Sequence, residues 1–283
     1  MPRYFLVLIF LVALSGCGGS SEDALIKKQI NLNQSAAEEL AKVKDANGAK
    51  QFLTNYGKER QKMMQKITDM IKSMPKEKVE SIVQRLNREV RPSQEKLDEA
   101  LADFNKRMIE GKSFPQVVME TSMGPVKIEL FDDLAPITVN NFLKYVDEQY
   151  FDGTIFHRVI SDFMIQGGGF EPGSLKKEKK TGAPIENESY NGMINDRGTL
   201  AMARTSDPNS ATAQFFISVK NNGFLNKIQA QDGYGYAVFG RVIDGMDVVD
   251  KIKEVETTTR GGHENVPVQD VLIKSIRRVD KKK

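Results

Sequence analysis

The sequence predicts an all-α segment followed by a mainly β domain, which we expect to close into an antiparallel barrel capped by two helices. Three observations lead to this fold class. Apolar residues recur at helical spacing as far as Lys112. After Phe114 and Pro115 the spacing becomes two, as in strands. Beyond that point many short strand patterns are interrupted by two isolated helical patterns, an arrangement that suits a closed barrel.

The composition is that of a soluble globular protein of one large domain or two ordinary ones. The chain has 283 residues, of which 40% are hydrophobic and 28% charged. The net charge of +3 is too small to indicate a nucleic-acid partner. The single cysteine excludes an intramolecular disulfide and a multi-cysteine metal site, and no residue cluster calls for a metal or another cofactor.

Residues 1–16 have the pattern of a secretory signal peptide. Arg3 precedes an apolar run that is well short of the roughly twenty residues a membrane-spanning helix needs. The sequence Leu-Ser-Gly-Cys ending at Cys17 resembles the lipobox of bacterial lipoproteins, in which the cysteine is acylated. The alternative is an ordinary signal with an incidental cysteine. The resemblance implies a secreted protein anchored through Cys17, on the periplasmic face of the outer membrane if the cell has two membranes. Residues 17–24 would be the tether.

Residues 25–112 carry four amphipathic helical patterns. We expect stops at Asn47-Gly48, Pro75 and Pro92. Because no helix can bury its own apolar face, the four must pack on one another or on a partner. The four apolar faces consist of Ile26, Ile30, Ala37 and Leu40; Phe52, Tyr56, Met63, Ile67, Met70 and Met74; Val79, Ile82, Val83, Leu86 and Val90; and Leu97, Leu101, Phe104 and Met108.

Three roles remain open for this helical segment. Its methionines, among them Met63, Met64 and Met108, are flexible and polarizable, which suits a surface that holds varied client chains. The same residues could simply pack the core of a small bundle that acts as a spacer. A homodimer through the helical segment is the third alternative, because four helices with two proline breaks need not close a core alone.

The β domain begins with a hairpin over residues 116–123 and 125–131 that turns at Gly124. Pro136 opens the first helix, since proline is favoured in a first helical turn. Residues 171–184 form a polar loop whose KKEKK run reads as a solvated tip. The second helix and a final strand over 271–279 follow. The second helix has Val248, Ile252 and Val255 on one face.

The stretch TIFHRVISDFMIQGGGF, residues 154–170, is the strongest candidate for a site. Arg158 and Gln166 interrupt an otherwise apolar wall, and three glycines follow that let the backbone bend or be approached closely. A cation and an amide on an apolar wall suit a ligand that is mostly apolar with a peptide-like polar part. The alternative for this stretch alone is a core strand with a surface arginine and a glycine turn.

Three downstream stretches decide between these alternatives: GTLAMARTSDPNSATAQFFI (198–217), GFLN (223–226) and YAVFGRVIDGMDVVDKI (236–252). In this order they closely resemble the cyclophilin family of peptidyl-prolyl cis-trans isomerases, in particular its bacterial branch. The resemblance covers roughly residues 113–279. It implies an eight-stranded antiparallel barrel capped by two helices over residues 113–283. It also implies isomerase activity on proline-containing, unfolded or flexible polypeptides.

The resemblance assigns the site residues, because rotation about an X-Pro bond needs no nucleophile, metal or proton carrier. A donor aimed at the twisted imide nitrogen is stronger in the transition state than in the planar ground state. The family's catalytic arginine matches Arg158, and Gln166 matches the amide that holds the substrate backbone. The residues matched to the proline pocket are Phe163, Met164, Phe216 and Leu225. Those matched to the rest of the groove are Ala203 and Arg204, for their backbone only, and Gln214.

Two positions depart from the best-known eukaryotic pattern: Phe224 stands where those proteins have Trp, and Tyr236 where they have His. Both resemble bacterial cyclophilins, so they affect the expected substrate preference and drug binding rather than activity. We expect cyclosporin to bind weakly, because Phe224 lacks the indole N–H that Trp would donate. We expect His157 to be buried and structural rather than a base, because consecutive strand residues face opposite sides. We expect His263 to be exposed in a glycine-rich loop. The competing function is a non-enzymatic chaperone or scaffold on the same fold.

Overall fold

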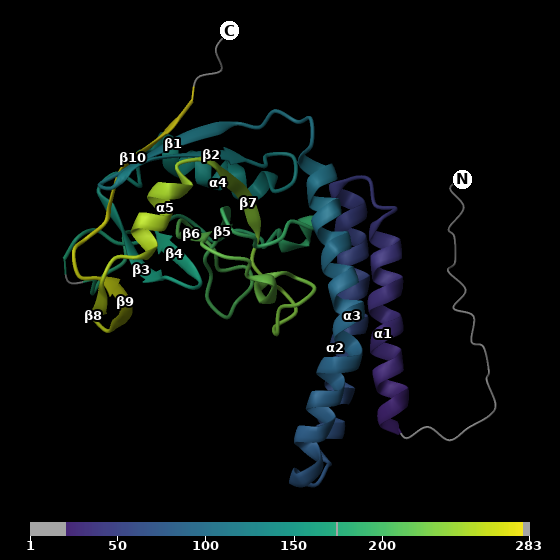
Figure 1. Cartoon of the computed structure of the whole chain (residues 1–283). Helices are drawn as coiled ribbons and strands as arrows, with labels where there is room; N and C mark the ends of the chain where they lie inside the picture. The colour runs from purple at the N-terminus through teal and green to yellow at the C-terminus, as the bar shows by residue number, and fades with distance from the viewer. Residues whose placement is uncertain (1–20, 174, 280–283) are drawn as a thin grey trace.

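The structure is a computed structural model that describes residues 21–173 and 175–279. The predicted signal peptide and the lipidation site at Cys17 lie outside these residues. Figure 1 shows a barrel domain with three long helices packed together at one side, all of which project beyond the barrel.

The N-terminal part is a three-helix module formed by α1 (Ser21–Leu40), α2 (Ala46–Lys72) and α3 (Lys76–Ile109). The sequence analysis predicted that the helices pack either on one another or on a partner, and in the structure they pack on one another. None of the described helices is both long and apolar enough to cross a membrane. The core of the module is built from Ala36, Leu40, Ala49, Phe52, Leu53, Tyr56, Leu97, Leu101, Phe104 and Met108.

The predicted helix break at Pro92 is wrong, because α3 continues through it as one helix of 34 residues. A proline inside a helix costs about 3 kcal/mol, since it removes a backbone hydrogen bond and crowds the preceding turn. Here Pro92 is exposed and the opposite side of α3 packs on α1. Asn33 of α1 donates from Nδ2 to the Ser93 hydroxyl at 3.2 Å, and that hydroxyl donates to the Val90 carbonyl at 2.7 Å. Tertiary packing therefore outweighs the local penalty.

The turn predicted at Asn47-Gly48 lies slightly earlier in the chain. Residues 41–45 form the turn, and Asn47 and Gly48 belong to the first turn of α2. Asp45 is the N-cap, and its carboxylate accepts the Gly48 N–H at 2.7 Å. A capped N-terminus of this kind satisfies a backbone donor that would otherwise lack a partner. The predicted break at Pro75 is confirmed, since Pro75 caps the start of α3.

Eight antiparallel strands close into the barrel in the order β1-β10-β3-β4-β6-β5-β7-β2, which confirms the predicted fold class. Two helices, α4 (Pro136–Asp147) and α5 (Met246–Lys253), pack on the barrel. The strands are β1 (Gln116–Thr121), β2 (Gly124–Leu130), β3 (Thr154–Ile160), β4 (Met164–Gly167), β5 (Thr199–Met202), β6 (Phe215–Ser218), β7 (Val238–Asp244) and β10 (Leu272–Arg278). Short 3-10 helices, η1 (Ser189–Asn191) and η2 (Gly223–Leu225), lie in the connecting loops.

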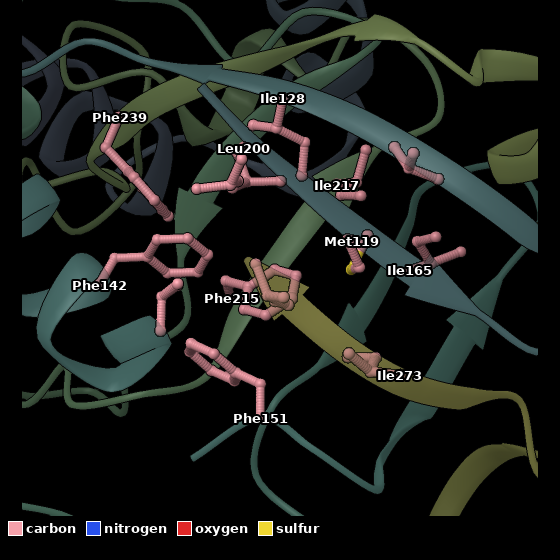
Figure 2. Close-up of a cluster of buried hydrophobic side chains, with 14 of the residues drawn as sticks. Met119, Ile128, Phe142, Phe151, Ile165, Leu200, Phe215, Ile217, Phe239 and Ile273 are labelled. Atoms are coloured by element: carbon pink, nitrogen blue, oxygen red, sulfur yellow. The ribbon is translucent and has the colours of Figure 1, made fainter. Parts of the chain in front are cut away.

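The barrel interior is filled by apolar side chains from the strands and from α4 (Figure 2). The Phe142 ring of α4 lies 5.1 Å from Phe151, 5.6 Å from Phe215 and 5.2 Å from Phe239, measured between ring centroids. This packing leaves no room at Gly168, where φ is +81° and a Cβ would lie 3.0 Å from the Phe151 and Phe215 rings. Gly168 is therefore required by the core as well as by its positive φ.

A small two-stranded sheet, which the sequence pattern did not predict, follows α5 and precedes β10 in the sequence. It consists of β8 (Thr257–Arg260) and β9 (His263–Pro267), joined at Gly261 and Gly262, both with positive φ. The apolar signal is weak here because most of the residues of β8 are exposed. His263 is exposed, as predicted, but it begins β9 rather than lying in a loop.

Candidate active site

A groove of about 720 Å³ lies on the outer face of the barrel, over β3, β4 and β6. The loop after β5 and the segment from η2 to Tyr236 form its other walls. All eleven residues that the sequence analysis assigned to the site line this groove, although they come from distant parts of the chain: Arg158, Phe163, Met164, Gln166, Ala203, Arg204, Gln214, Phe216, Phe224, Leu225 and Tyr236.

A β-bulge in β3 turns Arg158 toward the groove. Phe156 pairs with Gly167 and Arg158 pairs with Gln166, so His157 is the extra residue. Phe156 and Val159 point into the barrel core, whereas His157 and Arg158 both line the groove. The alternation used to place His157 away from Arg158 was therefore the wrong argument, because a bulge interrupts the alternation of sides. The expected burial of His157 is nevertheless correct, at 4% exposure.

Burial makes His157 a weak base. Its pKa is lowered from the usual range to about 4, first by burial and then by the nearby His263. Its ring packs on Phe170, with 4.7 Å between centroids, and Nδ1 has no hydrogen-bond partner among the described residues. His157 is thus neutral near pH 7.

A chain of polar side chains runs along one side of the groove. The Gln166 amide donates from Nε2 to Oε1 of Gln214 at 2.8 Å, and Gln214 donates in turn to Glu178 at 2.6 Å. The Arg158 guanidinium approaches Oε1 of Gln166 at 3.5 Å. Within the described residues no carboxylate forms an ion pair with Arg158. Its charge is therefore available to a ligand in the groove.

The floor of the groove is apolar. Met164 and Phe216 are almost completely buried, and Leu225 closes the floor from η2. The Phe163 and Phe224 rings lie 5.5 Å apart at the rim, and Phe224 is 57% exposed. This arrangement forms an open hydrophobic pocket next to a cation and two amides, which can hold an apolar residue and hydrogen-bond its flanking peptide groups.

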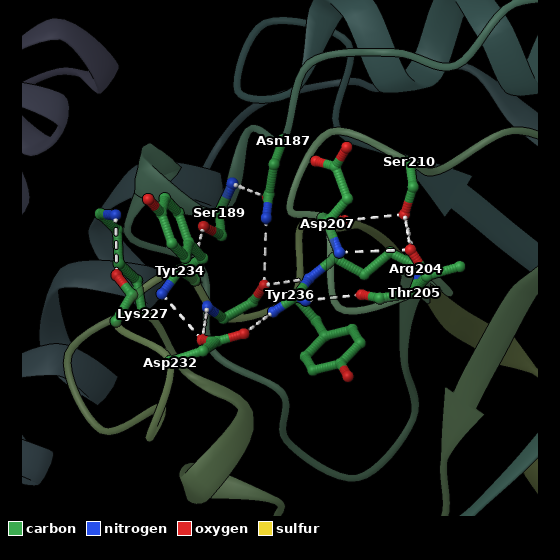
Figure 3. Close-up of polar contacts among 12 residues, drawn as sticks. Asn187, Ser189, Arg204, Thr205, Asp207, Ser210, Lys227, Asp232, Tyr234 and Tyr236 are labelled. Carbon is green, nitrogen blue, oxygen red and sulfur yellow. Dashed lines mark hydrogen bonds and ion pairs between the residues drawn. The ribbon is translucent and has the colours of Figure 1, made fainter.

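Arg204 has a side-chain role that sequence reasoning did not assign, since only its backbone was matched. The side chain is 3% exposed, and its guanidinium carbon lies 4.3 Å from the Tyr236 ring centroid. It donates to the Gly235 carbonyl at 3.0 Å and to the Thr205 carbonyl at 2.9 Å, and it forms an ion pair with Asp232 (Figure 3). Arg204 therefore connects the loop after β5 to the segment that carries Tyr236.

Several lining residues were missed by the sequence analysis. Glu178 belongs to the KKEKK run, which was interpreted as a solvated tip, yet its carboxylate contacts Gln214. Phe170 bridges the two histidines, with 5.1 Å between its centroid and that of His263. No local pattern marks these residues, because the contacts join segments that are distant in sequence, such as Glu178 with Gln214 and Phe170 with His263 of β9. The missed lining residues are His157, Phe170, Glu178, Gly262, His263, Glu264 and Asn265.

Metal chemistry finds no support in the geometry. No group of three or more His, Cys, Asp or Glu side chains is placed to hold a metal ion within residues 21–173 and 175–279. The groove instead has the features of a site that binds a polypeptide segment around one apolar residue. Together with the closed barrel, it defines an enzyme of the prolyl isomerase class.

Comparison with known proteins identifies the family. Residues 116–278 match the family described as cyclophilin type peptidyl-prolyl cis-trans isomerase/CLD. The chain belongs to this family, and the resemblance found in the motifs is confirmed for this part of the sequence. The match begins at residue 116, so the predicted lipoprotein signal and the helical module lie outside it.

Bacterial relatives named as peptidyl-prolyl cis-trans isomerases are similar to this chain. Peptidyl-prolyl cis-trans isomerase cyp18 of Streptomyces antibioticus is 59% identical over 162 residues, which are 57% of this chain and 96% of the relative. Peptidyl-prolyl cis-trans isomerase B of Escherichia coli is 58% identical over 161 residues, 56% of this chain and 97% of the relative. This chain is a peptidyl-prolyl cis-trans isomerase.

A solved cyclophilin-type isomerase of Cryptosporidium parvum has the same fold. It matches 60% of this chain and all of its own with a TM-score of 0.51 at 30% identity. Another structure of that protein was solved in the presence of the dipeptide Ala-Pro.

Proposed function

We propose that Arg158 accelerates rotation about X-Pro bonds by donating to the imide nitrogen as that bond twists. Rotation breaks amide resonance and crosses a barrier of about 18–20 kcal/mol. The nitrogen lone pair becomes available only in the twisted state, so a donor placed beside it stabilises the transition state more than the ground state. The observation that carries this proposal is an arginine at the edge of an open apolar pocket, which forms no ion pair with a carboxylate in the part of the chain that the structure describes.

The other groove residues hold the substrate in our proposal. The proline ring lies over Met164 and Phe216, between Phe163 and Leu225. The amide of Gln166 holds a substrate peptide group. The Ala203 N–H is already bonded to the Gln214 carbonyl at 3.0 Å, so the Ala203 carbonyl is the backbone group left to accept from the peptide. The resemblance assigned backbone pairing with the peptide to Ala203 and Arg204, and we propose the Ala203 carbonyl as one group that does so.

A direct assay distinguishes this mechanism from peptide binding alone. The chain without its predicted signal peptide (residues 17–283, called the mature chain below) is added to a short X-Pro peptide. Cis-to-trans exchange of the peptide is followed by NMR, and the peptide dissociation constant is measured alongside. We expect rapid exchange in the wild type and much slower exchange in Arg158→Ala at nearly unchanged affinity. Binding without accelerated exchange in the wild type would instead favour the chaperone or scaffold function.

We further propose that the enzyme acts on chains that fold outside the cytoplasm, held to a membrane by a lipid on Cys17. The support is the signal pattern before the only cysteine in the chain. Because only the three residues 18–20 separate that cysteine from α1, the helical module would stand between the membrane and the barrel.

Two of the open roles for the helical module remain proposals: the holding of client chains and homodimerisation. Met63 and Met108 are buried within the module, which favours core packing for these two, whereas Met64 is 41% exposed on α2. Light scattering on the mature chain tests dimerisation. Suppression of aggregation of a proline-free unfolded protein tests client holding, with Met64→Lys as the variant that should lose it.

A further inference from the structure

One wall of the groove rests on the helical module. Residues 221–237 supply Phe224, Leu225 and Tyr236 to the groove. On its other side this segment packs against α2 and α3. A single apolar cluster continues from the helices to the groove floor and includes Leu101, Phe104, Ile228, Leu225 and Phe216. The helices and the active-site wall therefore share one core.

The Asn105 side chain joins α3 to the barrel. It is 8% exposed, donates from Nδ2 to the Gly192 carbonyl at 2.8 Å, and accepts the Ile194 N–H at 3.0 Å. The preceding residue, Phe104, lies so close to Gly192 that a Cβ there would overlap its ring. Gly192 also has a φ of +83°, which a side chain would strain. Residues 192–194 therefore fit closely against Phe104 and Asn105 of α3.

A second group of contacts reaches the groove wall directly. Gln229 donates from Nε2 to Oδ1 of Asp98 on α3 at 2.6 Å. Arg60 of α2 approaches the Gln229 carbonyl at 3.4 Å. Burial raises the pKa of Asp98, and the amide of Gln94 also donates to its Oδ1, at 2.9 Å. Two helices therefore hold Gln229 from separate sides.

Backbone hydrogen bonds carry this support from Gln229 to the groove. Its N–H donates to the Asn226 carbonyl at 2.8 Å. Asn226 adjoins Leu225, whose carbonyl accepts the Tyr236 N–H at 3.0 Å. The Asn226 side chain also accepts from the Asn195 N–H at 2.7 Å, close to where Asn105 binds Ile194.

We propose that the helical module positions the groove wall formed by residues 221–237, with Asp98 and Asn105 as positioning residues. They touch no substrate and act through Gln229 and through residues 192–194. The module thereby sets the affinity for proline-containing peptides. Arg158 lies in β3, on the opposite wall of the groove, and its position does not depend on the module. The Streptomyces antibioticus and Escherichia coli relatives are matched by the barrel over 96% and 97% of their length, so the proposed support would distinguish this chain from those two.

The test uses Asp98→Ala in the mature chain, with Asp103→Ala as matched control, because Asp103 is an exposed carboxylate on the same helix. We expect Asp98→Ala to raise KM and the peptide dissociation constant about two- to tenfold, the scale of one lost hydrogen bond, with kcat unchanged. Amide hydrogen exchange at residues 225–236 should become faster, while β3 and β4 stay protected. Asp98→Asn keeps an oxygen for Gln229 and should restore wild-type values.

A second variant addresses the buried contact. Asn105→Leu has a similar volume but leaves the Gly192 carbonyl and the Ile194 N–H unpaired, so the same local exchange and the same rise in KM should follow. The inference is overturned if Asp98→Ala matches Asp103→Ala in affinity and exchange. It is also overturned if exchange rises uniformly over the barrel, which would indicate only lost stability. Hydrogen exchange measures the local stability of residues 225–236 and does not require an active enzyme. An inactive wild type would therefore count against the proposed mechanism and not against this inference.

Discussion

The guanidinium of Arg158 lies beside the side-chain amide of Gln166 on the facing strand, with 3.5 Å between Nη1 and Oε1. The amide carries no charge, so this long contact leaves the positive charge of the guanidinium available to a ligand. The Gln166 amide is itself oriented by Gln214. A planar donor that keeps its charge is suited to stabilising a twisted imide.

Arg158→Ala should therefore reduce kcat/KM for X-Pro isomerisation by about two to three orders of magnitude, the scale for losing one preorganised donor. Peptide binding should change little, since the apolar floor stays intact. Arg158→Lys is the informative companion, because it keeps the charge and loses the planar fork, and we expect it to remain strongly impaired. Near wild-type turnover in Arg158→Ala would refute the assignment.

Phe224→Trp should increase the affinity for cyclosporin. Phe224 is exposed at the rim of the groove, and it has no donor where an indole N–H could bind a carbonyl. One added hydrogen bond is worth about 0.5–1.5 kcal/mol, or roughly two- to tenfold in affinity. Calorimetric titration measures the difference. Tyr234→Trp, an exposed aromatic of the same segment that does not line the groove, serves as the control; equal affinities for wild type and Phe224→Trp would count against the prediction.

Cys17→Ser should abolish lipidation and leave the chain unprocessed. The reason is chemical, because the thiol is the acceptor in the lipobox reading and the chain contains no second cysteine. Incorporation of labelled fatty acid in a bacterial host, followed by membrane fractionation, measures the effect. A wild-type protein that takes up no label would show that the signal is of the ordinary secretory kind.

Acidification should destabilise the fold through His157. Its folded-state pKa of about 4 lies below the unfolded value near 6.5. Between these values the unfolded chain binds a proton that the native state does not. Stability conferred by neutral His157 is therefore present above pH 6.5 and is lost as the pH falls toward 4, by up to about 1.4 kcal/mol per pH unit.

Urea unfolding of wild type and His157→Gln from pH 7 to pH 4 checks this contribution. The variant should show a shallower loss of unfolding free energy with decreasing pH, whatever its absolute stability, because the carboxylates titrate in both proteins. Parallel pH profiles would show that His157 titrates alike in the folded and unfolded states.

The sequence by itself determined the division into a helical segment and a barrel, because side-chain periodicity reports directly on which face of each element is buried. It also predicted the start of α4 at Pro136 and eleven of the residues that line the groove, since the cyclophilin motifs carry those residues in recognisable order. The roles of these residues remain predictions until the variants above are measured.

Tertiary structure alone decided three features. Packing of α1 on α3 carries the helix through Pro92, against its local propensity. The bulge at His157 depends on the register between β3 and β4, which no single strand encodes. The hydrogen bond from Gln229 to Asp98 joins positions 131 residues apart in sequence. Local sequence reports propensity and periodicity, whereas these features depend on contacts between segments that meet only when the whole chain has folded.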